Sequence, residues 1–96
     1  MTGRTSRGAV KSIRVVAEFQ SPAITGAVIE TAAAQLQLLN PNIAVSEDGI
    51  LQLSCLVTAP SNALAVRFLV RRVRNTLADI GVDDTAVMIL LVESAM

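Results

Sequence analysis

The chain has almost none of the side chains from which enzymes assemble catalytic and metal sites. Its 96 residues include no His, no Tyr, no Trp and a single Cys, Cys55. These absences exclude most His- and Cys-based catalytic pairs and the usual zinc sites. A single cysteine also excludes an intrachain disulfide. The composition therefore favours a chain without catalytic residues, metal or cofactor.

An excess of charge of one sign and a long apolar run are absent as well. Eight Lys and Arg balance eight Asp and Glu, and the 52% of hydrophobic residues is too high for a disordered chain. The longest apolar run, residues 86–92, is far shorter than the ~20 residues of a membrane-spanning helix. The polar N-terminal residues lack the apolar stretch of a secretory signal. We therefore expect a cytoplasmic protein without a membrane partner.

Charge is unevenly distributed at the start of the chain. Arg4 and Arg7 precede the first acidic residue, Glu18, and glycines lie beside them. This composition predicts a flexible basic N-terminal arm over residues 1–10 and a single domain over residues 11–96. The arm is interpreted as a solvated tail, and contact with phosphate or an acidic partner is the alternative.

The first part of the domain predicts a strand followed by a helix. Apolar residues alternate with polar ones over residues 11–20, which indicates a strand covered on one face. Ser21 and Pro22 are typical of an N-cap and a first helical residue. Apolar residues then recur at helical spacing until Asn40 and Pro41, which end the helix because proline disfavours helical geometry in the residue before it.

Turn residues divide the rest of the chain. Asp48 and Gly49 lie between two apolar runs and predict a tight hairpin. Gly81 is well placed to end a second helix in the left-handed conformation. The elements expected here are strands over residues 42–46 and 50–58, a helix over residues 63–80 and a last strand over residues 86–93.

The expected order of elements is βαββαβ, the plan of the ferredoxin-like or split βαβ fold. Right-handed crossovers place both helices on one face of a four-stranded antiparallel sheet. The first and third strands are then central, and the second and fourth lie at the edges. The sequence therefore predicts an α+β domain of this class.

The last strand is apolar on both faces. Alternation places one set of its side chains against the helices and a second set, Met88, Leu90 and Val92, on the opposite face. An edge strand of this kind is expected only where both faces are covered. We therefore expect a homodimer or a higher homo-oligomer. The alternative is that the N-terminal arm covers this face in a monomer.

Arginines gather on one side of the second helix. Arg67, Arg71 and Arg74 are spaced so that they share a face. This face is either solvated or a binding surface for an acidic protein partner or a phosphate. RNA-recognition domains of similar topology stack bases on aromatic residues of the central strands. Those strands offer only Phe19, on the predicted buried face, so nucleic acid is a disfavoured partner.

The junction between the first strand and the first helix is the candidate ligand site. Gln20, Ser21 and Gly26 lie there, and a helix N-terminus attracts small anions such as a carboxylate or phosphate. Cys55 is interpreted as a small core residue. Asp83 and the neighbouring aspartate are interpreted as a polar loop rather than a cation site.

The chain resembles the ACT-like regulatory domains over residues 13–92. The resemblance rests on the βαββαβ order, on Pro22 at the first strand–helix junction and on apolar residues of the outer sheet face. It implies dimerisation and binding of an amino acid or a similar effector near that junction. The family's typical Pro-Gly pair is absent, because three residues separate Pro22 from Gly26.

Two functions are consistent with these expectations. The leading hypothesis is a non-catalytic, homo-oligomeric interaction or regulatory module that binds a small anionic effector. The alternative is a purely structural assembly protein that contacts a larger partner through its apolar sheet surface and its arginines. An enzyme is the third interpretation, because candidates for acid, base and nucleophile are few.

Overall fold

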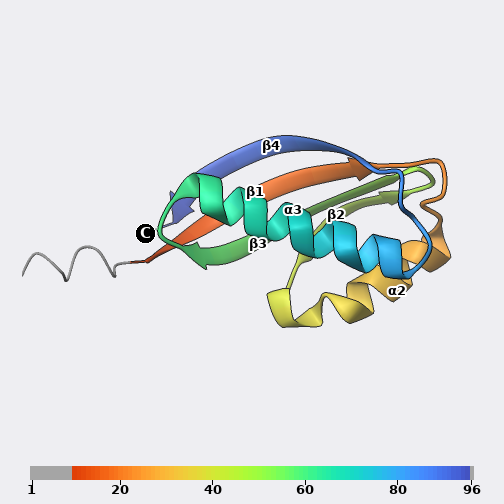
Figure 1. Ribbon diagram of the computed structural model, residues 1–96, viewed down its shortest axis with the longest axis horizontal. Coiled ribbons are helices and arrows are strands. Elements are labelled where there is room, and N and C mark those ends of the chain that lie inside the picture. The colour runs from red at the N-terminus through yellow and green to blue at the C-terminus, as the bar shows by residue number, and fades with distance from the viewer. Residues whose placement is uncertain (1–9, 96) are drawn as a thin grey trace, which may run out of the picture.

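The computed structural model describes residues 10–95, without the side chains of residues 44–47 and 95. It is an α+β structure with a four-stranded antiparallel sheet, two α-helices and a short 3-10 helix (Figure 1). The elements are β1 (Lys11–Gln20), α2 (Gly26–Gln35), η1 (Gln37–Leu39), β2 (Asn42–Glu47), β3 (Ile50–Ala59), α3 (Asn62–Asp79) and β4 (Ala86–Ala95). Of the expected basic arm, residues 1–9 lie outside the described residues.

The strands follow the order β2-β3-β1-β4. β1 and β3 are therefore central and β2 and β4 are the edges, as predicted. β1 pairs with β3 along its whole length, from Lys11 opposite Ala59 to Gln20 opposite Ile50. At its other side β1 pairs with β4, and Ser12 lies opposite Ala95, so the two ends of the described chain are neighbours in the sheet (Figure 1).

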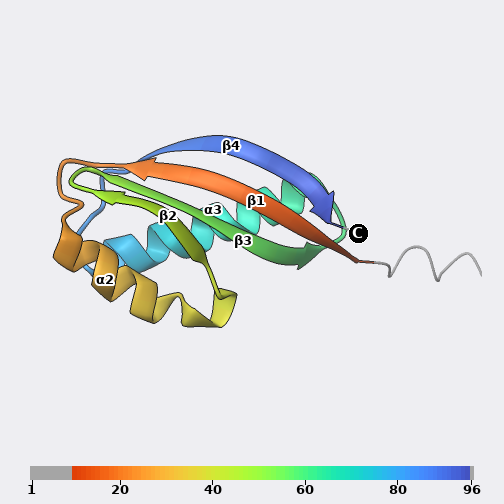
Figure 2. The same ribbon diagram turned by 180° about the vertical axis from the view of Figure 1, so that it is seen from behind.

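One face of the sheet carries the core. Alternate residues of β1, from Ile13 to Phe19, are fully buried, and the residues opposite them on β3 are buried as well. Helix α3 packs across β1, β3 and β4, while α2 lies beside α3 and next to β2. Figure 2 shows the sheet from behind, with its strands in front of α3. Ile29 and Ala32 of α2 and Leu69 and Val73 of α3 belong to the same core.

Helix α2 begins later than the sequence predicts. Its N-cap is Thr25, whose hydroxyl accepts a hydrogen bond from the Val28 N–H. The predicted N-cap, Ser21, instead forms a turn in which its hydroxyl accepts from the Ala23 N–H. Fully buried Ile24 fixes this turn against the core, so the chain cannot enter a helix before Thr25.

The end of α2 also differs from the prediction. The α-helix stops at Gln35, and after Leu36 the residues Gln37–Leu39 form the 3-10 helix η1. Asn40 then adopts the left-handed conformation, with φ 48°. Asparagine tolerates this conformation better than most residues, which lets the chain reverse towards β2.

Helix α3 follows its sequence signals closely. The Ser61 hydroxyl accepts from the Leu64 N–H and caps the first turn. Gly81, with φ 103°, follows the last turn as expected. None of the helices in the described chain combines the length and the hydropathy that a membrane crossing needs.

Strand β4 contains a β-bulge that changes which residues face the core. Met88 lies opposite Glu18, but Leu91 lies opposite Val16, and Leu90 is the extra residue between the two registers. A bulge inserts one residue and so reverses the alternation beyond it. The prediction that Val92 faces away from the helices is therefore wrong. It lies opposite Val15 and packs against the core.

Candidate functional site

The edge strand β4 exposes four consecutive apolar residues. These residues are Met88, Ile89, Leu90 and Leu91. They are between 37% and 53% exposed. No strand of the described chain pairs with the outer edge of β4. Its sequence from Thr85 to Val92 has no charged side chain. Soluble proteins commonly protect such an edge with charges or proline. Residues 86–92 of β4 have neither, and its one charged residue, Glu93, lies near the C-terminal end of the strand.

The outer face of the sheet is less apolar than the sequence suggests. Leu56 is largely exposed, but Val16 is only partly so. Polar residues separate them, because Arg14 lies opposite Leu56 and Ser54 lies opposite Val16. Arg14 Nε is also 3.9 Å from the Glu93 carboxylate, with both side chains about half exposed. Among the described side chains of the sheet, the large exposed apolar residues other than Leu56 lie on the edge strand β4.

Two carboxylates of the outer face do not form a catalytic pair. Glu18 lies opposite Met88, whereas Glu93 lies opposite Arg14, four pairs further along β1. At about 3.3 Å per residue, these positions are roughly 13 Å apart along the strand. Glu18 accepts a hydrogen bond from the Gln20 amide. A general acid and base acting on one bond would need to converge on it.

The strand–helix junction brings two of its three candidate residues together. Gln20 and Ser21 line a shallow hollow of about 420 Å³, whereas Gly26 does not. The other residues of its lining are Pro22, Gly49, Asp84 and Ala86. Sequence reasoning did not connect Asp84 with this junction, because only the register of β4 beside β1 brings the two segments together.

Most amides of this junction are already engaged. The Ser21 N–H donates to the Gly49 carbonyl at 3.1 Å, and the Gly49 N–H donates to the Ile24 carbonyl at 2.7 Å. The N–H groups of Ala23 and Ile24 donate to Ser21. The hollow thus offers an anion one carboxylate and few free amides. Binding of a small anionic effector at this junction stays a prediction.

Helix α3 carries the arginines as a continuous exposed row. Arg67, Arg71 and Arg74 are all exposed, and Arg74 Nη2 donates to the Thr85 carbonyl at 2.9 Å. Arg72 is partly buried. The structure thus brings the three predicted residues together on one surface. We call Arg67, Arg71 and Arg74 the arginine row.

Two apolar residues beside the arginine row were missed by sequence reasoning. Leu64 and Phe68 are 45% and 46% exposed, and with Arg67 and Arg71 they line a hollow of about 280 Å³. The sequence contains a signal for this pair. Two large apolar residues four positions apart, outside the core stripe of a helix, lie next to each other on its surface.

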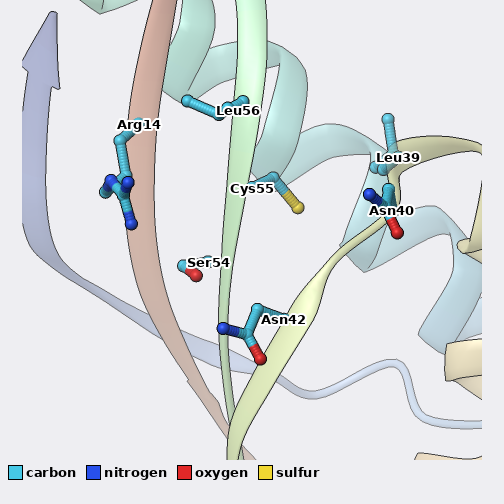
Figure 3. A pocket seen from close by; sticks show the side chains of 7 residues that line it. All are labelled: Arg14, Leu39, Asn40, Asn42, Ser54, Cys55 and Leu56. Atoms are coloured by element: carbon cyan, nitrogen blue, oxygen red, sulfur yellow. The ribbon is translucent and has the colours of Figure 1, made fainter. Parts of the chain in front are cut away.

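A further hollow of about 380 Å³ lies where β2 begins beside β3 (Figure 3). The Cys55 sulfur points towards Leu39 and Asn40 on one side of β3, and Arg14 lies on neighbouring β1. The remaining lining residues are Asn42, Ser54 and Leu56. Burial raises the pKa of the Cys55 thiol to about 11, so at neutral pH it is protonated and a poor nucleophile.

The described residues contain no group of three His, Cys, Asp or Glu placed to hold a metal ion. The resemblance to ACT-like regulatory domains rests on the order of the elements and stays a prediction. We compared the chain with family models, with curated proteins and with solved structures, and none of the three comparisons finds a match.

Proposed function

We propose that this chain is a non-catalytic interaction module that forms a homo-oligomer through strand β4. The observation that carries the proposal is the edge strand β4, which is uncharged over residues 86–92 and has four exposed apolar residues at positions 88–91. Its free N–H and carbonyl groups offer a template for another strand. Its apolar side chains lose contact with water when that strand binds.

A second copy of β4 is a suitable partner for this edge. Two antiparallel copies related by a two-fold axis would place the same neutral segment on both sides of the interface. Residues 85–92 carry no charge, so no like charges oppose each other across its centre. The two sheets then form one continuous eight-stranded sheet. In each copy, α3 still covers the core face of its own four strands.

We also assign the domain to the ferredoxin-like class. The strand order β2-β3-β1-β4 and the two helical connections between strands support this assignment. In such a domain, an interaction through β4 extends the sheet without disturbing the helices that complete the core.

Solution mass tests the proposed assembly. Light scattering coupled to gel filtration should give about twice the 10.1 kDa of one chain for the wild type. Leu90→Lys should give the monomer mass, because a lysine on an edge strand opposes pairing with a second strand. Leu38→Lys is the matched control, since Leu38 in η1 is 89% exposed and remote from β4 in the chain.

Circular dichroism should show that both variants are folded. A wild type that stays monomeric at roughly millimolar concentration would exclude the homo-oligomer. An equal loss of mass in both variants would exclude β4 as its interface. If the wild type is monomeric but binds a larger protein, and Leu90→Lys abolishes that binding, the result would instead support the alternative function, a structural assembly protein.

A further inference from the structure

The outward surface of helix α3 combines positive charge with exposed apolar hollows. The arginine row runs along its centre. On one side, Leu64 and Phe68 form the hollow of about 280 Å³ with Arg67 and Arg71. Both arginines therefore border an apolar surface that water contacts in the free protein.

A second hollow adjoins the same arginines. It has a volume of about 390 Å³, and its lining residues are Val66, Arg67, Val70, Arg71, Arg74 and Asn75. Val66 and Val70 are only partly buried, although they are adjacent in sequence to core residues of α3. The arginine row thus has apolar side chains at both flanks, and of Leu64, Phe68, Val66 and Val70 only Val66 packs against the core.

The charge of this surface is not compensated inside the described chain. Among the described side chains, no carboxylate lies within ion-pair distance of an α3 arginine, and the one ion pair found among them joins Arg14 to Glu93. Arg67 and Arg71 are four residues apart, and like charges at this spacing destabilise a helix. The stability of α3 therefore does not explain them, whereas an external anionic partner does.

The chemistry of the hollows favours a protein over other anionic partners. The whole chain has a formal net charge of zero and so lacks the strong basic field typical of nucleic-acid-binding domains. A phosphate backbone has nothing to bury against Leu64, Val66 or Val70. Carboxylates form paired hydrogen bonds with guanidinium groups, and apolar side chains can fill the two hollows.

We infer that the outward surface of α3 binds an acidic amphipathic helix of a partner protein. Its Asp and Glu side chains pair with the arginine row, and its apolar residues, at helical spacing, enter the hollow beside Leu64 and Phe68. This inference goes beyond the proposed assembly and uses no residue of β4. A monomeric chain would present the same surface.

Fluorescence anisotropy with a synthetic peptide tests this inference. The probe is a fluorescein-labelled peptide of roughly 18 residues, long enough to form a helix, with Leu at helical spacing and Glu elsewhere. Wild-type protein should bind it with an affinity that falls as salt is added. The same peptide with Gln in place of Glu should bind at least about ten-fold more weakly.

Two matched double variants locate the binding surface. Arg67→Gln with Arg71→Gln should weaken peptide binding at least about ten-fold, because guanidinium–carboxylate pairs are lost. Lys11→Gln with Arg14→Gln removes the same charge from β1 and should change the affinity by less than about two-fold. Phe68→Ser keeps all charges and should also weaken binding at least about five-fold.

Several results would overturn the inference. No binding of the peptide by the wild type at roughly millimolar protein would do so. If both double variants weaken peptide binding equally, the affinity depends on the net charge of the protein and not on the surface of α3. Tighter binding of a single-stranded oligonucleotide or of anionic phospholipid vesicles would assign the surface to another class of partner. Loss of self-association in the Arg67→Gln, Arg71→Gln variant would assign it to a second copy of the chain.

Discussion

At the scale of single residues, Cys55 is the side chain whose chemistry the fold alters most. It is 3% exposed and lies in the middle of β3, with its sulfur towards Leu39 and Asn40 (Figure 3). Burial raises its pKa from 9.0 to about 11, because removal from water disfavours the charged thiolate. The folded protein therefore binds the thiol proton more tightly than the unfolded chain does.

This difference makes the free energy of unfolding depend on alkaline pH. The contribution of Cys55 is fully present below pH 9 and is lost as the pH rises through 11, by about 3 kcal/mol in total. Urea unfolding followed by circular dichroism at pH 8, 9, 10 and 11 measures it. Cys55→Ala should lower stability at pH 8 but flatten the decrease above pH 9.

Few other groups obscure this titration. The chain contains no tyrosine and a single lysine, Lys11, so Cys55 is the main buried group that titrates between pH 9 and 11. The absence of histidine also predicts constant stability between pH 6 and 8. A wild type and a Cys55→Ala variant with parallel pH profiles would contradict the assignment.

Two glycines are expected to respond in opposite ways to the same substitution. Gly49 has φ 89° in the β2–β3 turn, so Gly49→Ala forces an alanine into a conformation that L-residues avoid and should cost about 1–2 kcal/mol. Gly26 is the first residue of α2, and a Cβ there meets nothing within 4 Å. Gly26→Ala should therefore stabilise the protein by about 0.4–1 kcal/mol.

Thermal unfolding by circular dichroism compares these two variants with the wild type. A higher melting temperature is expected for Gly26→Ala and a lower one for Gly49→Ala. Equal shifts of one sign would mean that backbone conformation at the two positions does not govern the effect.

At the scale of elements, local signals predicted most of the structure. Gly81 ends α3 where the sequence places it, because a left-handed glycine is a property of a few neighbouring residues. The Asp48-Gly49 turn is also where the sequence places it. These elements depend little on the rest of the chain, so their residues alone were sufficient.

Two of the element-scale errors have tertiary causes. Ser21 satisfies the local requirements of an N-cap, but the hydrogen bonds between Ser21, Ile24 and Gly49 hold the segment in a turn. The bulge at Leu90 depends on how β4 pairs with β1, and strict alternation cannot reveal it. Val92 was consequently assigned to the wrong face, and the exposure of Leu91 was missed.

At the scale of the whole molecule, the sequence predicted the positions of the central and edge strands. It could not show that the outer sheet face is mostly polar beside Arg14 and Ser54, because the register between strands decides which side chains are neighbours. Nor could it show the hollows beside the arginine row. The candidate surfaces were therefore predicted in outline, and their boundaries come from packing.

Assembly through β4 has a consequence for stability that can be measured. A partner that binds only the folded state stabilises it by mass action. The melting temperature of the wild type should therefore rise by a few degrees between roughly 5 and 500 µM protein, whereas that of Leu90→Lys should stay constant. A wild-type melting temperature independent of concentration would contradict the proposed homo-oligomer.

The pairing of Ser12 with Ala95 also determines how the sheet can form. Contact between β1 and β4 closes a loop that contains almost every other described residue, and closing so long a loop has a large entropic cost. The hairpin of β2 and β3 and the helices are more local and can form earlier. Until β4 docks, the flank of β1 is open to strands of other molecules, so the refolding yield should depend on how dilute the chain is.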